Sequence, residues 1–527
     1  MKKVNYPQRA IITVGKPDGH KQIHVGHLSG GLISSDIFAR FLRNRIGRDN
    51  VLFFSGTECY GTAVYGEYLK RQQDYKTIQE YVRDNFLKQE YMLKKFQIDL
   101  NEFFCDCNNK QLHKIHEDTC KQFVNCLIEN DDILKVDEKI LVDPDNDCFL
   151  NYRQIKYLND GDIKQKGRRY NTEDILKIVS SISGKPPVEK EVQNYYINIL
   201  KRKNEINNLH NDKYSELSKY TKNILNELPN IARLTCNANS GVDVEINGES
   251  KKIWNWIDSL IAPISYTIYY LSEKNKGTND WKDWWSKDDS EIYHFMAQDN
   301  VFFYTILENY LIQSWNKTNR EKINFPQFNL MPMRTLFYGK YKGPFPTGEM
   351  LLDNYSVESL RYTFASMGDG NSSFNPEKLI DKSIEKDNID FKYNAILKKI
   401  KRLVGTAISK MQENEKKTTA SKEAVAFGSK LFNRYENIMF NRQFSKAIDL
   451  IEENFKNILN DKENIFYNTK MIIVMLYPFL PELMEKIYKK IYTDNELYEN
   501  YNVNNPTIVV QSFQTKAHLL DIGKFER

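Results

Sequence analysis

A short segment near the N-terminus places two imidazoles and a glycine at a spacing that suits phosphate chemistry. His24-Val25-Gly26-His27 follows a glycine-containing loop and precedes an amphipathic stretch. Helix N-termini favour anions, and imidazoles can donate hydrogen bonds to phosphate charge that develops during transfer. Gly26 would let a nucleotide base approach the backbone. Taken alone, the tetrapeptide is also explained by an incidental histidine pair. A metal-binding pair is disfavoured, because such pairs usually need i,i+4 spacing and a third ligand.

Two further segments carry groups that could bind a charged substrate. Gly339-Lys340-Tyr341-Lys342-Gly343 frames two lysines with glycines, so the ammonium groups could approach a polyphosphate; a solvated loop is the alternative. Ser55-Gly56-Thr57-Glu58 follows a buried apolar run. Ligands of open α/β sheets bind at the carboxyl ends of strands, so Glu58 could hold a substrate ammonium there.

The elements that must position these groups can be read from apolar periodicity. Residues 10–14 and 51–54 are short apolar runs that predict buried strands, with an amphipathic helix between them. Strand, helix and strand predict an α/β Rossmann-like doubly wound parallel sheet. A polar segment, with helix-like stretches at 173–181 and 192–200, predicts an inserted connective subdomain, and helical spacing from about residue 383 predicts a C-terminal α-helical bundle. The expected domain boundaries give 1–135 and 236–382 as halves of the catalytic domain, 136–235 as the insert and 383–527 as the bundle.

Composition excludes several classes of protein. The chain has 527 residues, a net charge of +5 and 41% hydrophobic residues, which indicates a globular protein and permits a nucleic-acid partner without requiring one. No apolar run of about 18 residues is present, so no membrane span is expected. The N-terminus shows no secretory signal, so the seven cysteines are expected to be reduced in the cytoplasm. No C-x-x-C pair occurs, which argues against a zinc knuckle, and no metal ligands are predicted. We expect a monomer.

Five segments, in their order along the chain, resemble the class I aminoacyl-tRNA synthetases, and the methionyl type in particular. The first signature is matched by the His24 segment, preceded at the right distance by Pro17. Counting back from the last segment places Lys340 on the second lysine of the family's second signature. The other segments that carry the resemblance are Gly56-Thr57-Glu58-Cys59-Tyr60-Gly61, Ile261-Ala262-Pro263-Ile264-Ser265-Tyr266, His294-Phe295-Met296-Ala297-Gln298-Asp299 and Ser359-Leu360-Arg361-Tyr362.

The resemblance implies a mechanism and a role for each matching residue. An amino acid would be activated by ATP to an aminoacyl adenylate and then transferred to tRNA, with Mg²⁺ held largely by the phosphates. His24, His27 and Lys340 would stabilise the phosphates, and Glu58 would hold the α-ammonium of the amino acid. The further nucleotide-binding positions implied are Pro17, Gly26, Asp243, Asp299 and Lys342.

The sequence departs from the family where the amino-acid side chain would bind. The second signature has lost both serines and its first lysine. The pocket positions implied by the resemblance are Lys16, Asp18, Ser259, Pro263, Tyr266, Asn300 and Tyr304, and only Pro263 and Tyr266 keep the family's residues. Lys16 and Asp18, buried beside an apolar methionine, would have no partner except each other. We therefore expect methionine to be a poor substrate and a more polar or larger amino acid to be preferred. An outward-facing Lys16–Asp18 pair is the alternative.

A basic stripe in the bundle predicts contact with RNA. Lys398, Lys399 and Arg402 lie within about one helical turn, and a solvated helix face is the alternative. The expected function is that of a methionine–tRNA-ligase-like enzyme with a tRNA and an amino acid as substrates. The competing interpretation is a synthetase paralogue that activates an amino acid for another acceptor, or that only binds RNA.

Overall fold

A parallel five-stranded sheet forms the centre of the molecule. The computed structural model describes residues 4–151, 154–157, 178–213, 228–273, 280–296, 300–330, 345–367, 389–411 and 417–510. The strand order is β13-β12-β1-β2-β3, and every neighbouring pair is parallel. The strands are β1 (Arg9–Val14), β2 (Val51–Gly56), β3 (Glu102–Phe104), β12 (Ser290–Met296) and β13 (Gln327–Leu330). The two strands predicted from apolar runs are confirmed as β1 and β2, and the Rossmann-like fold class is confirmed with them.

Helices cover both faces of this sheet, so its strands are buried on both sides. Alternate residues of β1 point to opposite faces: Ile12 packs into the core beside α2, whereas Ile11 packs into the core beside α5 and α8. The helices between β2 and the insert are interrupted by β3. The first covering helix, α1 (Val25–His27), continues through a π-helical segment (Leu28–Leu32) into α2 (Ile33–Ile46). A second π-helical segment (Phe302–Glu308) precedes α10 (Asn309–Thr318). The other covering helices are α3 (Thr62–Leu69), α4 (Ile78–Lys95), α5 (Lys110–Glu129), α8 (Asn255–Glu273) and α9 (Lys282–Trp285).

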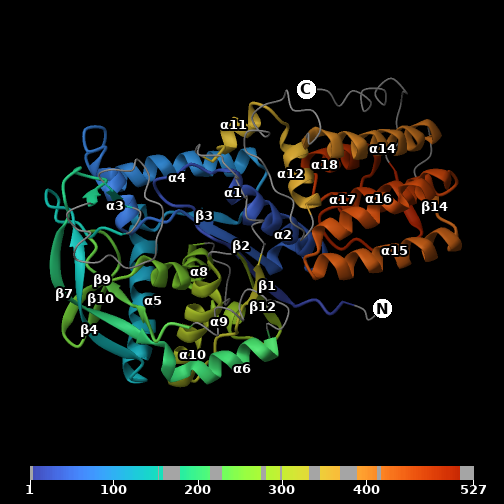
Figure 1. Cartoon of the computed structure of the whole chain (residues 1–527). Helices are drawn as coiled ribbons and strands as arrows, with labels where there is room; N and C mark the ends of the chain where they lie inside the picture. Colours follow the sequence, from blue (N-terminus) through green and yellow to red (C-terminus); the bar gives the residue numbers. More distant parts are fainter. Residues whose placement is uncertain are drawn as a thin grey trace.

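Antiparallel strands lie at one end of the molecule (Figure 1). β4 (Ile133–Val142) pairs with β7 (Val188–Asn198), which pairs with β8 (Ile231–Arg233). The helix predicted at 192–200 is therefore wrong, because most of that stretch is strand. The described part of the stretch at 173–181 is strand as well. The remaining elements of this region are β5 (Ile155–Tyr157), β6 (Ile178–Ser180), a helix α6 (Lys203–Lys213), β9 (Thr235–Cys236), β10 (Asp243–Ile246) and β11 (Glu249–Ile253).

A helical bundle lies at the opposite end, drawn in orange and red in Figure 1. The predicted helical C-terminal region is confirmed. Two of its helices are separated by a segment that contains Pro478, which lacks the N–H that the helical hydrogen-bond ladder needs. A short strand pair is added to the helices. The elements are α14 (Ile389–Lys410), β14 (Lys417–Thr419), α15 (Lys422–Phe440), α16 (Phe444–Asn460), α17 (Ile465–Leu476), α18 (Pro481–Ile491) and β15 (Thr507–Val509).

One buried arginine fastens the bundle to the sheet domain. Arg361 lies on α12 (Val357–Ser366), and its side chain is fully buried. It pairs with Asp36 of α2 at 2.6 Å and donates to the carbonyls of Pro478 at 3.0 Å and Phe479 at 3.2 Å. These bonds satisfy a buried cation from both sides of the junction, so they fix where the bundle sits. Among the described residues, no helix is long and apolar enough to cross a membrane.

Candidate active site

The two histidines sit where the chain turns from β1 into its first helix. His24 is the N-cap of α1, and its ring nitrogen Nδ1 accepts the backbone N–H of Gly26 at 3.0 Å. The His27 Nδ1 accepts the backbone N–H of His24 at 3.3 Å, and the two rings stack with centroids 3.8 Å apart. A neutral imidazole that accepts at Nδ1 carries its proton on Nε2. Both rings therefore offer an Nε2–H donor.

Both imidazoles are held in the neutral form. Burial lowers the pKa of His24 from 6.5 to about 4, with a further contribution from Lys21. Burial also lowers the pKa of His27 to about 3, and the neighbouring His24 adds to the shift. At neutral pH both rings are therefore uncharged. Each can donate its Nε2–H to a phosphate oxygen and so stabilise negative charge there.

The segment that follows the second signature closes against the first. Lys340 and Lys342 lie outside the described residues, and the described chain resumes at Phe345, whose ring stacks on His24 with centroids 5.0 Å apart. The N–H of Val25 donates to the carbonyl of Pro346 at 2.9 Å, and the N–H of Gly348 donates to the carbonyl of Ile23 at 2.8 Å. Two segments far apart in the sequence are thus joined at His24.

A buried cluster of charged residues occupies the carboxyl ends of β1, β2 and β3. The ammonium of Lys16 lies 3.5 Å from Glu58 and 3.7 Å from Asp106, and its side chain is 8% exposed. Although burial opposes it, the attraction of Glu58, Tyr266 and Asp106 raises the pKa of Lys16 well above its usual value. Burial raises the pKa of Glu58 to about 7, against the pull of Lys16. Ser259 donates a hydrogen bond to Glu58 Oε2, the same oxygen that faces the Lys16 ammonium.

These contacts give three residues other partners than expected. Glu58 was expected to be open to a substrate ammonium, but the Lys16 ammonium already lies beside it. Lys16 and Asp18 were expected to have no partner except each other; instead Lys16 pairs with Glu58 and Asp106. Asp18 pairs with Lys21, with its side chain 36% exposed. The outward-facing Lys16–Asp18 pair is wrong as well. The reason is that the loop after β1 turns at Gly19, whose N–H donates to the Glu58 carbonyl at 2.9 Å.

The remaining pocket positions lie on the two helical segments that face this cluster. Tyr266 is buried on α8 and stacks on Phe104, with centroids 4.3 Å apart. Tyr304 lies near His294, with ring centroids 5.5 Å apart. The Glu58 N–H donates to the Pro17 carbonyl at 2.9 Å, which ties the loop after β1 to the end of β2.

Two predicted positions are placed by single contacts. Asn300 approaches Gly15, and a Cβ atom built on Gly15 would lie 4.0 Å from the Asn300 amide nitrogen. Pro263 is buried within α8, where its carbonyl accepts the Thr267 hydroxyl at 2.8 Å. The structure thus brings Lys16, Glu58 and Ser259 into direct contact.

Sequence reasoning missed three buried ionisable residues of the same cluster. Asp106 follows β3 and is fully buried, and Asp258 and His116 face each other at 3.4 Å. His116 Nδ1 also lies 2.9 Å from the Ser265 hydroxyl. Asp106 could have been found from its position after a strand end, like Glu58. His116 and Asp258 lie inside helices, where nothing in the sequence separates a buried charge from a surface one.

One predicted nucleotide-binding position, Asp243, is not brought to the histidines. Asp243 lies on β10 in a separate antiparallel sheet, where it pairs with Lys252 at 2.7 Å. Asp299 lies outside the described residues.

Comparison with known proteins decides the family. A family model described as "tRNA synthetases class I (M)" matches residues 10–399. The chain belongs to this family.

Curated relatives and solved structures agree with this assignment. The methionine–tRNA ligase of Thermoplasma volcanium is 21% identical over 98% of both chains. That of Flavobacterium psychrophilum is 27% identical over 58% of this chain and 45% of its own length, so the chain spans about half of that relative. Mycobacterium tuberculosis methionyl-tRNA synthetase bound by methionyl-adenylate superposes with a TM-score of 0.66 at 13% identity, covering 96% of this chain and 99% of that one, which shows a shared fold.

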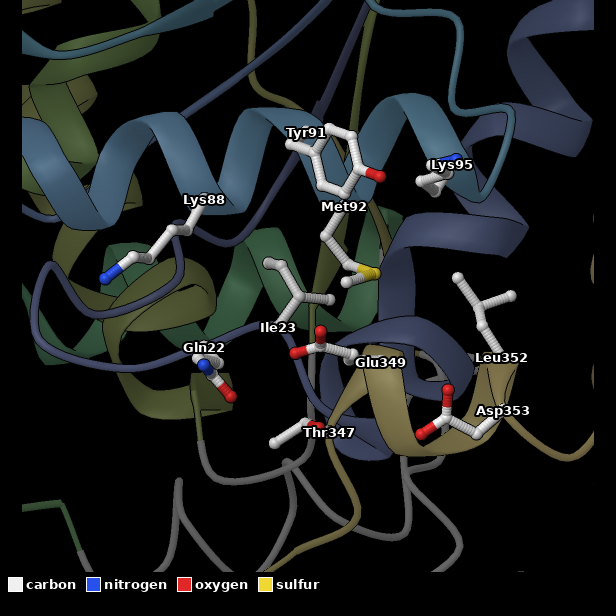
Figure 2. A pocket seen from close by; sticks show the side chains of 10 residues that line it. All are labelled: Gln22, Ile23, Lys88, Tyr91, Met92, Lys95, Thr347, Glu349, Leu352 and Asp353. Atoms are coloured by element: carbon white, nitrogen blue, oxygen red, sulfur yellow. The ribbon is translucent and has the colours of Figure 1, made fainter.

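A cavity of about 440 Å³ adjoins the first signature of this class I synthetase. Figure 2 shows its lining, with Tyr91 and Met92 from α4 above Ile23, and Glu349 from α11 (Gly348–Leu352) beside them. None of the predicted site residues lines this cavity. It is separate from the buried charged cluster.

The basic stripe of the synthetase's bundle is narrower than predicted. Lys398 and Arg402 are exposed on α14. Lys399 instead pairs with Glu452 at 2.8 Å, and its ammonium lies 5.9 Å from the ring centre of Phe455. Lys399 is therefore a poor candidate for a phosphate contact.

Proposed function

We propose that this class I synthetase activates an amino acid with ATP and transfers the acyl group to tRNA, as a methionine–tRNA-ligase-like enzyme. The observation that carries the proposal is the pair of neutral imidazoles with both Nε2–H groups available as donors. Such donors stabilise the charge that develops as pyrophosphate leaves the α-phosphate. ATP fits this site, because donors and a close backbone approach at Gly26 are what a triphosphate and its base require. Mg²⁺ would be held mainly by phosphate oxygens and would neutralise their charge.

A second candidate function is a synthetase paralogue with a changed amino acid. The observation that favours it is the Lys16–Glu58 pair, which places a cation where the resemblance implies the substrate ammonium. A methionine side chain would also meet the buried carboxyl group of Asp106, at a cost in desolvation. A pocket that can hydrogen-bond discriminates strongly against a substrate without polar groups.

Amino-acid-dependent ATP–pyrophosphate exchange across all twenty amino acids tests the proposal. We expect exchange with at least one amino acid, and slower exchange with methionine than with a polar or larger one. Exchange with none refutes the enzyme. Fastest exchange with methionine refutes the changed specificity and leaves the methionine–tRNA-ligase-like activity.

Transfer to tRNA is tested separately, by acid-gel separation of charged from uncharged tRNA. Charging of one tRNA species supports the ligase, whereas exchange without charging supports another acceptor. The cytoplasm is the proposed compartment, and it is supported by seven cysteines that are all free thiols. The domain boundaries and a monomeric state are kept as parts of the same proposal.

A further inference from the structure

Three cysteines that are distant in the sequence meet at the carboxyl edge of the parallel sheet. Cys59 follows β2, and Cys105 and Cys107 follow the adjacent strand β3. Their sulfur atoms all lie within 4.8 Å of one another. Because β2 and β3 are parallel neighbours, the turns after them must lie side by side, and the fold itself gathers the thiols.

The separations of the sulfur atoms match a tetrahedral metal. Cys59 Sγ and Cys105 Sγ are 3.7 Å apart, and Cys105 Sγ and Cys107 Sγ are 3.9 Å apart. Thiolates bound to zinc at about 2.3 Å in tetrahedral geometry lie about 3.8 Å from each other. A disulfide would need a sulfur–sulfur distance of about 2.05 Å. Two of the three sulfur–sulfur distances therefore match those of metal ligands, and the third is at most 4.8 Å.

The surroundings suit thiolates that carry negative charge. The amide of Asn108 donates to Cys105 Sγ at 3.1 Å and lies 3.6 Å from Cys107 Sγ. Donors of this kind orient metal ligands and stabilise their charge. Cys59 and Cys107 also line a cavity of about 330 Å³ together with Tyr60 and His113. The side of the cluster away from Cys105 is thus open to a fourth ligand.

We propose that Cys59, Cys105 and Cys107 bind one thiophilic divalent cation, zinc in the first instance, with an open fourth coordination position that faces this cavity. The sites that zinc uses in catalysis keep one position open in the same way. The sequence did not predict this site, because its ligands form no C-x-x-C pair and come from two strands. The site differs from the phosphate site at His24, and it would stand even if the proposed amino-acid activation failed.

The experiment measures metal binding on the full chain and does not depend on activity. Purified protein is stripped with a chelator and titrated with Zn²⁺ against a chromophoric competitor, and Co²⁺ is used as the spectroscopic probe. We expect one equivalent per chain, with the intense thiolate-to-cobalt bands of a tetrahedral sulfur-rich site. Addition of imidazole should shift the cobalt bands, since it can occupy the open position. Unshifted bands would overturn the open position, and absent thiolate bands would overturn the site.

Cys107→Ser is the decisive variant, because Cys107 is the least buried of the three. Zinc affinity should fall by more than about 100-fold, since even outer-shell partners are worth 10–100-fold. Cys126→Ser is the matched control: Cys126 is buried, and its sulfur accepts from Asn319 at 3.3 Å, which a serine oxygen can also do.

Thermal melts separate a lost ligand from a damaged fold. In excess chelator, Cys107→Ser should melt as wild type does, and only wild type and Cys126→Ser should be stabilised by zinc. Equal zinc affinity in Cys107→Ser and wild type would overturn the assignment. A Cys59–Cys105 disulfide in protein purified under reducing conditions would do the same.

Discussion

The substitution His24→Asn separates the structural role of this residue from its chemical role. His24 caps α1 through Nδ1, which accepts the Gly26 N–H. Asparagine is among the best N-cap residues, and its side-chain oxygen can accept the same bond. Asparagine does not titrate, and its amide does not reach as far as Nε2 of a histidine. The variant should therefore keep the helix start while losing the titration and the phosphate donor.

The sign of the pH effect follows from a lowered pKa on a base. The pKa of His24 is about 4 in the folded protein, against an ordinary value of 6.5. Between these values the unfolded chain binds a proton that the folded protein does not, so stability falls as the pH drops from 6.5 towards 4. Below 4 both states are protonated and this loss stops growing. At pH 4.5 the loss from His24 is about 2 kcal/mol relative to pH 7, allowing for its partial exposure.

The assay is urea unfolding of wild type and His24→Asn at pH 7 and at pH 4.5. The difference in unfolding free energy between the two proteins should change by about 2 kcal/mol in favour of the variant at the lower pH. In the same variant, pyrophosphate exchange at pH 7 should slow by the equivalent of about 2–4 kcal/mol, as for loss of one donor to a charged transition state. If the stability difference between the two proteins does not change with pH, the pKa of His24 is not lowered in the folded protein. Unchanged exchange in a folded variant would refute its role as a donor.

Three further experiments test the second-signature loop, the bundle surface and the buried charged cluster. Lys340→Ala should slow pyrophosphate exchange by about 2–4 kcal/mol of transition-state stabilisation; an unchanged rate would move the assignment to another lysine of that loop. Neutralising Lys398 and Arg402 should reduce the slope of log affinity against log salt concentration for tRNA binding by roughly 1–2. The slope is measured by filter binding at several salt concentrations, and Lys399→Ala should change it little. Lys16→Met should cost about 3–5 kcal/mol of stability in urea unfolding, and should raise methionine-dependent exchange relative to wild type. Lower methionine exchange in this folded variant would show that Lys16 does not block the pocket.

The sequence was sufficient for the parts of the fold that local pattern determines. Apolar runs at 10–14 and 51–54 predicted β1 and β2, because a strand buried on both faces has no polar alternation. The strand β7 was missed, since its polar first half, with Lys190 and Glu191 exposed, resembles a solvated helix until its pairing with β4 is known. The ends of β2 and β3 are adjacent only through the sheet, so neither the Lys16–Asp106 contact nor the three-cysteine cluster could be read from spacing.

The buried cluster is the basis of the proposal that this chain uses a different amino acid. Two bases, Lys16 and His116, face three carboxyl groups, those of Glu58, Asp106 and Asp258. An amino-acid substrate adds one ammonium to this cluster. Because the carboxyl groups outnumber the bases, this ammonium can still pair with a carboxyl group. An uncharged apolar side chain, in contrast, would desolvate these groups and return no hydrogen bond. At the phosphate end of the site, the neutral imidazoles of His24 and His27 are suited to adenylate formation. At the amino-acid end, the side chains are mostly ionisable. The proposed change of amino acid, with the activation chemistry retained, would account for both ends of the site together.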